Sequence, residues 1–150
     1  MSVLNANIDV LEERFPSVAR SVKHAHVDAS VEIETARSGD PTLRLRTPDG
    51  PGAYLHSRFD PRREGRRRGD EVSPRVGYLV MWGPGLFYEV DHLFDRPGLR
   101  RLVALEPDRN ILRAALAARD LSRVLRDPRL HLLVGGAAGA SEAARYVGAT

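Results

Sequence analysis

The chain of 150 residues has no cysteine, a single lysine (Lys23) and no long apolar run. Without cysteine it forms neither a disulfide nor a thiolate metal site, which suits a cytoplasmic protein. No segment approaches the roughly 20 apolar residues of a membrane helix. The N-terminal stretch carries Asp9, Glu12 and Glu13 where a signal peptide would have a basic end and an apolar block. The sequence therefore predicts a cytoplasmic protein with no membrane partner.

Positive charge is carried almost entirely by arginine, and the formal net charge is +3. The arginines are densest between Arg58 and Arg75. Because runs of like charge are usually solvated faces, this stretch favours an exposed helix and linker, and nucleic acid is not a favoured partner. The functional alternative is a rim that attracts a phosphate or an acidic sugar. No HExxH, DxD, P-loop or CxxC pattern occurs, so we expect no metal site.

Residues 1–72 predict a small α+β unit. Apolar residues recur at helical spacing over residues 2–23, with an interruption at Pro16. Residues 31–35 and 43–47 alternate apolar and polar side chains around a turn, which predicts an antiparallel hairpin with residues 53–56 as a third strand. Asp60 followed by Pro61 is a natural helix start, because aspartate caps free N–H groups and proline fits the first helical position.

From residue 73 onward, strand and helix patterns alternate. We expect strands at 76–82, 102–105 and 130–134, helices at 86–94 and 107–121, and a further helix at 140–147. Such alternation with short connections calls for a parallel sheet. The predicted fold class is α/β: a small N-terminal α+β unit (1–72) followed by a partial, half doubly wound Rossmann-like sheet (73–150), in one compact domain.

The stretch from Val76 to Val90 contains the most informative feature, a glycine turn between a buried strand and a helix. Gly83 and Gly85 let the backbone approach a ligand. Glu106 follows at close to the roughly 20 residues that separate the glycine turn from the ribose-binding acid in nucleotide-binding units. We therefore expect Gly83, Gly85, Glu106 and Asp108 to bind a nucleotide-type small molecule. Asp108 has an equally good structural role, as the cap of the helix that follows Pro107.

Four groups of residues resemble a known family, the motility accessory factors, which are flagellin glycosyltransferases. The resemblance is to their N-terminal Rossmann-like region, which is related to the archaeal 6-hydroxymethylpterin diphosphokinase-like proteins. It covers roughly residues 40 to 136. The matching groups are the block 54–61 with Glu64, the turn 83–86 with Tyr88, the triplet 106–108, and residues 119–121.

The specific part of the resemblance is the block that contains His56, Ser57, Arg58 and Asp60. It implies a family signature that joins the N-terminal unit to the Rossmann-like half and lines its crevice. A catalytic-triad interpretation of His56, Ser57 and Asp60 is rejected, because sequence spacing sets no nucleophile–base geometry and Asp60 has its capping role. No catalytic residue is assigned.

The sequence departs from the family at three points. Phe87 stands where the family usually has a third glycine, and Gly65 where it favours alanine. The family's central catalytic domain has no counterpart in these 150 residues. The resemblance therefore implies an N-terminal or accessory domain of a glycosyltransferase-like protein, which binds a nucleotide, a nucleotide sugar or a partner protein.

Two other functions stay open. The glycine turn with Glu106 also fits a small S-adenosylmethionine-dependent methyltransferase. A pterin diphosphokinase relative would need ATP and Mg²⁺, for which the sequence offers no acidic cluster. An incomplete parallel sheet also has an edge that must be covered, so we expect a protein partner or a second copy to bind there or at the last helix.

Overall fold

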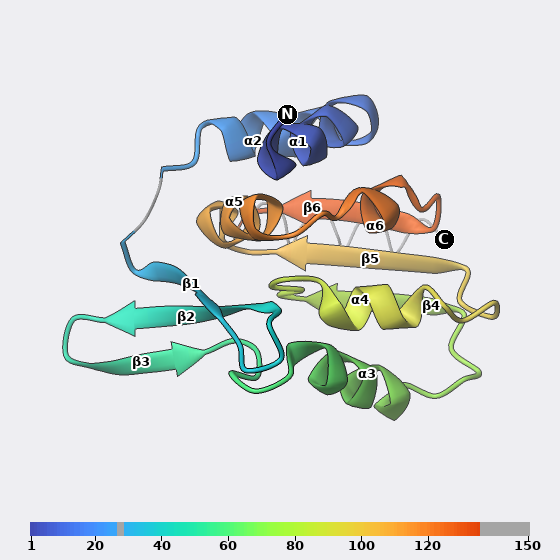
Figure 1. Ribbon diagram of the computed structural model, residues 1–150. Helices are drawn as coiled ribbons and strands as arrows, with labels where there is room; N and C mark the ends of the chain where they lie inside the picture. The colour runs from blue at the N-terminus through green and yellow to red at the C-terminus, as the bar shows by residue number, and fades with distance from the viewer. Residues whose placement is uncertain (27–28, 136–150) are drawn as a thin grey trace.

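A computed structural model of the chain describes residues 1–26 and 29–135. It confirms the predicted α/β class, with a three-stranded parallel sheet flanked by helices and a separate antiparallel sheet (Figure 1). The helix expected at 140–147 lies outside the described residues. None of the helices in the described part is long and apolar enough to cross a membrane.

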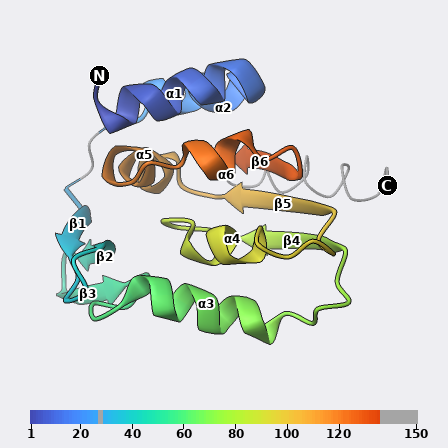
Figure 2. The same cartoon turned by 45° about the vertical axis from the view of Figure 1, so that its right-hand side comes forward.

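The parallel sheet has the order β4-β5-β6, so β5 lies between the other two strands (Figures 1 and 2). Its strands are β4 (Tyr78–Trp82), β5 (Arg101–Glu106) and β6 (Leu130–Val134), close to the predicted ranges. Residues opposite each other, such as Val80 and Val103, share one face. Three consecutive, adjacent parallel strands are the expected half of a doubly wound sheet.

The helices of this half are α4 (Tyr88–Leu93), α5 (Arg109–Ala118) and α6 (Ser122–Arg126). The prediction of one helix through Leu121 is wrong, because Arg119 is extended (φ −134°, ψ 145°) and ends α5 at Ala118. The helix expected from Leu86 likewise begins only at Tyr88. Phe87 has a left-handed backbone (φ 67°), which no helix interior accommodates.

Helix α3 (Pro61–Glu71) begins as predicted, with the Asp60 carboxylate accepting the Arg63 N–H at 3.0 Å. It packs closely on α4 through two glycines. A Cβ on Gly65 would lie 2.8 Å from the Tyr88 backbone, and one on Gly69 would lie 2.5 Å from the His92 ring. Gly65 weakens the helix by about 1 kcal/mol relative to alanine but allows this contact between the helices.

The antiparallel sheet comprises β1 (Val31–Thr35), β2 (Pro41–Thr47) and β3 (Gly50–Tyr54), in that order. The third strand begins three residues before the predicted 53–56 and ends at Tyr54. The register of β2 and β3 is irregular between Leu45 and Thr47, and β3 therefore starts earlier than predicted. Position 52 in this region requires glycine, because its φ is 80° and a Cβ there would lie only 2.1 Å from the Leu45 carbonyl oxygen.

Helices α1 (Val3–Arg14) and α2 (Pro16–Lys23) lie against α5, α6 and β6, on the side of the parallel sheet away from α3 (Figures 1 and 2). Buried Asn7 joins α1 to the break after α5. Its Nδ2 donates to the carbonyls of Leu116 (2.8 Å) and Arg119 (2.7 Å), and its Oδ1 accepts the Leu121 N–H (3.0 Å). One hydrophobic core includes side chains from the N-terminal helices, β2 and the Rossmann-like half.

Candidate functional site

The glycine turn lies at the carboxyl end of β4. Gly83 (φ 70°) and Gly85 (φ 57°) both have left-handed backbones, a conformation that favours glycine. The Gly83 N–H donates to the Leu105 carbonyl at 2.8 Å, and the Phe87 N–H donates to the Pro84 carbonyl at 2.9 Å. The first bond fixes the turn against the end of β5, and the second closes the turn itself.

Glu106 ends β5 and is nearly buried, with 2% of its surface exposed. One carboxylate oxygen accepts the Gly85 N–H at 3.3 Å and the other accepts the Asp108 N–H at 3.2 Å. Burial raises the pKa of Glu106 to about 7, although the two backbone N–H groups act in the opposite direction. Glu106 thus ties the glycine turn to the loop between β5 and α5.

Asp108 has the capping geometry of the structural alternative. It is the N-cap residue of α5, and its Oδ1 accepts the Asn110 N–H at 2.8 Å. The structure therefore brings Gly83, Gly85, Glu106 and Asp108 together, as predicted from their spacing, and engages their polar groups in bonds within the chain. Whether they bind a ligand stays a prediction.

His56 is the residue of the signature block that reaches the turn. Its Nε2 accepts the Leu86 N–H at 2.9 Å, and its ring meets Tyr88 edge-on at 5.5 Å. Burial, followed by the charges of Arg68 and Arg119, lowers the pKa of His56 to about 4. The imidazole is therefore neutral near pH 7, with its proton on Nδ1 because Nε2 is the acceptor.

Ser57, Arg58 and Asp60 serve the junction between the antiparallel sheet and α3. The Ser57 hydroxyl accepts the N–H groups of Phe59 and Asp60, both at 3.1 Å. The Arg58 guanidinium lies over the exposed rings of Tyr54 and Phe59. Neither Arg58 nor Asp60 contacts the glycine turn, so the structure separates them from His56.

A crevice of about 170 Å³ opens between the glycine turn and helix α3. We call it the glycine-turn crevice; its polar and glycine lining is His56, Glu64, Gly65, Arg68, Gly83, Gly85 and Glu89. Glu106 and Asp108 do not line it.

Two carboxylates of the crevice, Glu64 and Glu89, were not assigned a binding role from the sequence. Glu64 Oε1 accepts the Ser57 N–H at 3.1 Å, and Glu64 Oε2 lies 3.9 Å from the Arg68 guanidinium. Burial is the main cause of a raised pKa for Glu89. Among the described residues, no group of three acidic or histidine side chains is placed to hold a metal ion.

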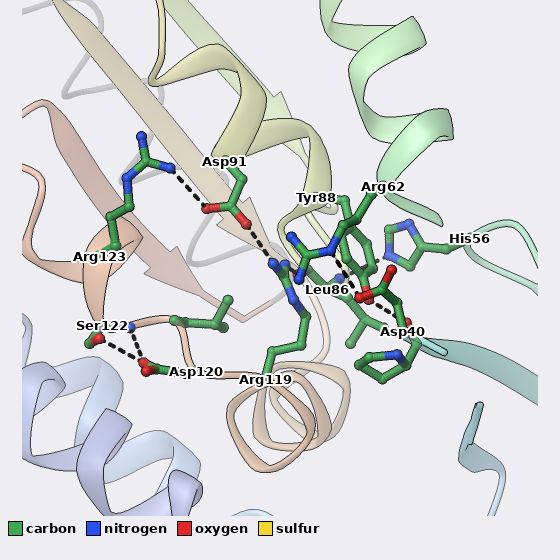
Figure 3. A network of polar contacts seen from close by, with 12 residues as sticks. Asp40, His56, Arg62, Leu86, Tyr88, Asp91, Arg119, Asp120, Ser122 and Arg123 are labelled. Carbon is green, nitrogen blue, oxygen red and sulfur yellow. Dashed lines mark hydrogen bonds and ion pairs between the residues drawn. The ribbon is translucent and has the colours of Figure 1, made fainter. Parts of the chain in front are cut away.

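A buried arginine, Arg119, holds Tyr88 and the backbone of Leu86 (Figure 3). Arg119 lies over the Tyr88 ring at 4.0 Å, donates to the Leu86 carbonyl and pairs with Asp91 at 2.5 Å. The Tyr88 hydroxyl donates to the Pro41 carbonyl, which links α4 to β2. The resemblance included Arg119 without a role; in the structure its guanidinium holds the Tyr88 ring and the Leu86 carbonyl.

Phe87 explains one departure from the family. Its left-handed backbone is the conformation that glycine adopts most readily, so the third glycine that the resemblance implies would fit the same turn. The Phe87 ring is fully buried in the core and does not line the crevice. The side chain of Phe87 therefore points into the core and does not fill the crevice.

Comparison with known proteins supports the fold. No family model matches the sequence. A protein of Treponema pallidum (strain Nichols), named only as uncharacterized, is 30% identical over 138 residues, covering 85% of this chain and 45% of that protein. The structure of the MAf glycosyltransferase from Magnetospirillum magneticum AMB-1 is similar with a TM-score of 0.67 and 15% identity, covering 97% of this chain and 29% of that chain.

At 15% identity the likeness to the glycosyltransferase shows a shared fold alone. It confirms the architectural part of the resemblance, whereas the relation to pterin diphosphokinases stays a prediction. This chain spans less than half the length of either relative.

Proposed function

We propose that this chain is an N-terminal or accessory domain of the motility-associated glycosyltransferase type, and that its glycine-turn crevice binds the hydroxyl-bearing part of a nucleotide-sugar-like ligand. The observation that carries the proposal is the pairing of two carboxylates, Glu64 and Glu89, with a glycine turn in one crevice. The shared fold with a glycosyltransferase supports it. No catalytic step is assigned to the described residues.

The chemistry of the lining favours hydroxyl groups. Carboxylates accept hydrogen bonds from sugar hydroxyls, and Glu89 has no hydrogen-bond partner within the described chain. Arg68 lies in the same crevice and supplies a positive charge for a carboxylate or phosphate group. Neutral His56 offers its Nδ1–H as one more donor.

A phosphate directly on the turn has less support. The N–H groups of Gly83, Gly85, Leu86 and Phe87 donate to Leu105, Glu106, His56 and Pro84 respectively. A phosphate would have to displace one of these acceptors. The position of Glu106 weakens the methyltransferase alternative, because that function needs Glu106 to accept ribose hydroxyls, whereas its carboxylate is nearly buried and does not line the crevice.

Isothermal titration calorimetry with UDP-, GDP- and CMP-sugars tests the proposal, with S-adenosylmethionine titrated separately. We expect at least one nucleotide sugar to bind, and Glu89→Gln to weaken that binding about tenfold, as loss of a charged acceptor does. Glu13→Gln, at an exposed position on α1, is the control and should leave binding unchanged. Absence of heat with every sugar nucleotide, or binding of S-adenosylmethionine alone, would refute the proposal.

A further inference from the structure

Strand β4 exposes three large apolar side chains on one face. Tyr78, Val80 and Trp82 are 64%, 51% and 61% exposed. On the same face of the neighbouring strands, Val103, Leu105 and Leu133 are buried in a small cluster of their own. This face of the sheet is therefore covered at β5 and β6 and uncovered at β4. We call Tyr78, Val80 and Trp82 the open β4 face.

The backbone of the same three residues points to the open side of the sheet. Gly83 donates to Leu105 and Gly77 accepts from Arg101, so these odd-numbered residues face β5. In a parallel ladder the N–H and C=O groups of alternate residues point to opposite sides. The groups of Tyr78, Val80 and Trp82 are consequently directed away from β5, where the described chain has no further strand.

The other outer strands of the two described sheets are protected against pairing. Strand β1 carries Glu32 and Glu34, and β3 carries Pro51. Charged side chains and proline on an outer strand each discourage the addition of a further strand. Strand β6 has α1 and α2 beside it: Arg14 donates to the Leu130 carbonyl at 3.4 Å. Strand β4, with the sequence YLVMW, has neither a charge nor a proline. It differs from the other outer strands by lacking these devices.

Helix α3 does not close this surface. It lies beyond β4, on the side of the sheet where α4 lies (Figure 2). Its buried residues are Pro61, Gly65 and Gly69, and the two glycines contact α4. The open β4 face is on the opposite side of the sheet from the core that α4 joins. A covering element must therefore approach from the side that α3 and α4 leave free.

We propose that β4 is an inner strand of a larger sheet, completed by a parallel strand beside it and an amphipathic helix over the open β4 face. Parallel sheets are stable only when both faces are covered, and one strand–helix unit covers both the edge and the face. The two similar proteins are long enough to contain such a strand–helix unit outside the matched region, since the match covers 45% and 29% of their lengths. A second copy paired edge to edge would satisfy the backbone of β4 but leave the apolar face in water.

The test replaces the matched region of the Treponema pallidum relative with this chain and compares the fusion with the isolated chain by hydrogen exchange. We expect amides of residues 78–82 to exchange at least about tenfold more slowly in the fusion, because they become laddered and covered. Trp82, the only tryptophan of this chain, should be quenched by iodide in the isolated chain and protected in the fusion. The exchange of β1 serves as the internal reference.

The substitution Val80→Lys tests whether the open β4 face is covered in the fusion. It should destabilise the fusion and leave the isolated chain unaffected, whereas Ile33→Lys, at an exposed β1 position, should affect neither. Equal exchange of residues 78–82 in both proteins would overturn the proposal, as would a dimeric isolated chain in which those amides are already protected. If the fusion does not fold, the isolated chain is mixed with the remainder of the relative as a separate polypeptide, and unchanged exchange there also overturns it.

Discussion

Gly83 and Gly85 have the same left-handed backbone but different surroundings. A Cβ on Gly85 would lie 2.5 Å from His56 Nε2, whereas a Cβ on Gly83 would meet nothing within 4 Å. The two positions therefore separate the backbone requirement for glycine from the requirement for space. Only Gly85 is placed to link the conformation of the turn to the signature histidine.

We expect Gly85→Ala to lower the free energy of unfolding by about 2–3 kcal/mol, because it combines backbone strain with displacement of His56 from the Leu86 N–H. Gly83→Ala, which brings the backbone strain alone, should cost about 1–2 kcal/mol. Urea denaturation of the two variants measures the difference. Equal losses would show that His56 can move at no cost.

Glu106 and His56 change the stability of the chain over overlapping pH ranges and in opposite directions. The folded pKa of Glu106, about 7, lies above its ordinary 4.5, so its stabilisation is full below pH 4.5 and is lost as the pH rises through 7. The folded pKa of His56, about 4, lies below its ordinary 6.5, so its stabilisation is full above pH 6.5 and is lost as the pH falls through 4. Each shift corresponds to up to about 3 kcal/mol.

Single substitutions should uncover these opposing dependences. In Glu106→Gln the free energy of unfolding should rise from pH 4 to 6.5, because, of these two groups, only His56 still contributes. In His56→Gln it should fall from pH 4.5 to 7, because, of the two, only Glu106 still contributes. Urea denaturation at half-unit pH steps provides the measurement. Identical pH profiles for both variants and the parent chain would contradict the shifted pKa values of Glu106 and His56.

At the scale of elements, Asn7 connects the N-terminal helices to the Rossmann-like half. Its side chain makes three buried hydrogen bonds to the backbone around the break between α5 and α6. Asn7→Ala should therefore destabilise the chain by about 2–4 kcal/mol, since it leaves buried backbone groups without partners. Asn5→Ala, an exposed position on the same helix, should change stability by less than about 0.5 kcal/mol. Thermal or urea unfolding of the pair is the measurement, and equal effects would show that the bonds of Asn7 contribute nothing.

The elements that sequence predicts best are those with local signals. Asp60 and Pro61 mark the start of α3, and short apolar runs mark the three parallel strands. The break at Arg119 has one local signal, the Asp120 carboxylate that accepts the Ser122 N–H at 3.0 Å, and it also depends on bonds to Leu86 and Asn7, which are distant in sequence. The late start of α4 depends on the unusual backbone of Phe87, which its residue type does not reveal.

The candidate site shows the same limit. The spacing of Gly83, Gly85 and Glu106 correctly brings these residues to one end of the sheet. Spacing does not reveal that Glu106 is buried and bonded to two N–H groups, or that Glu64 and Glu89 from neighbouring helices line the crevice instead. Those facts follow from the packing of α3 on α4, which is a tertiary contact.

At the scale of the whole molecule, the glycine-turn crevice lies at the carboxyl end of β4, and β4 is also the strand with the uncovered face. Ligand crevices of open α/β sheets lie at the carboxyl ends of strands, where the order of the strands reverses. If a further strand pairs with β4, the glycine-turn crevice lies at that position. The proposed ligand site and the proposed partner surface are then adjacent parts of one arrangement, though each can be tested separately.

The most direct test of ligand binding in the glycine-turn crevice is a nuclear magnetic resonance titration of the ¹⁵N-labelled chain with sugar nucleotides. We predict saturable shifts of the Gly83, Gly85 and Glu89 amides, which are lost in Glu89→Gln. The amide of Ala117, beside a separate hollow against α5, should not move. Shifts confined to that hollow, or no shifts with any sugar nucleotide, would contradict the account.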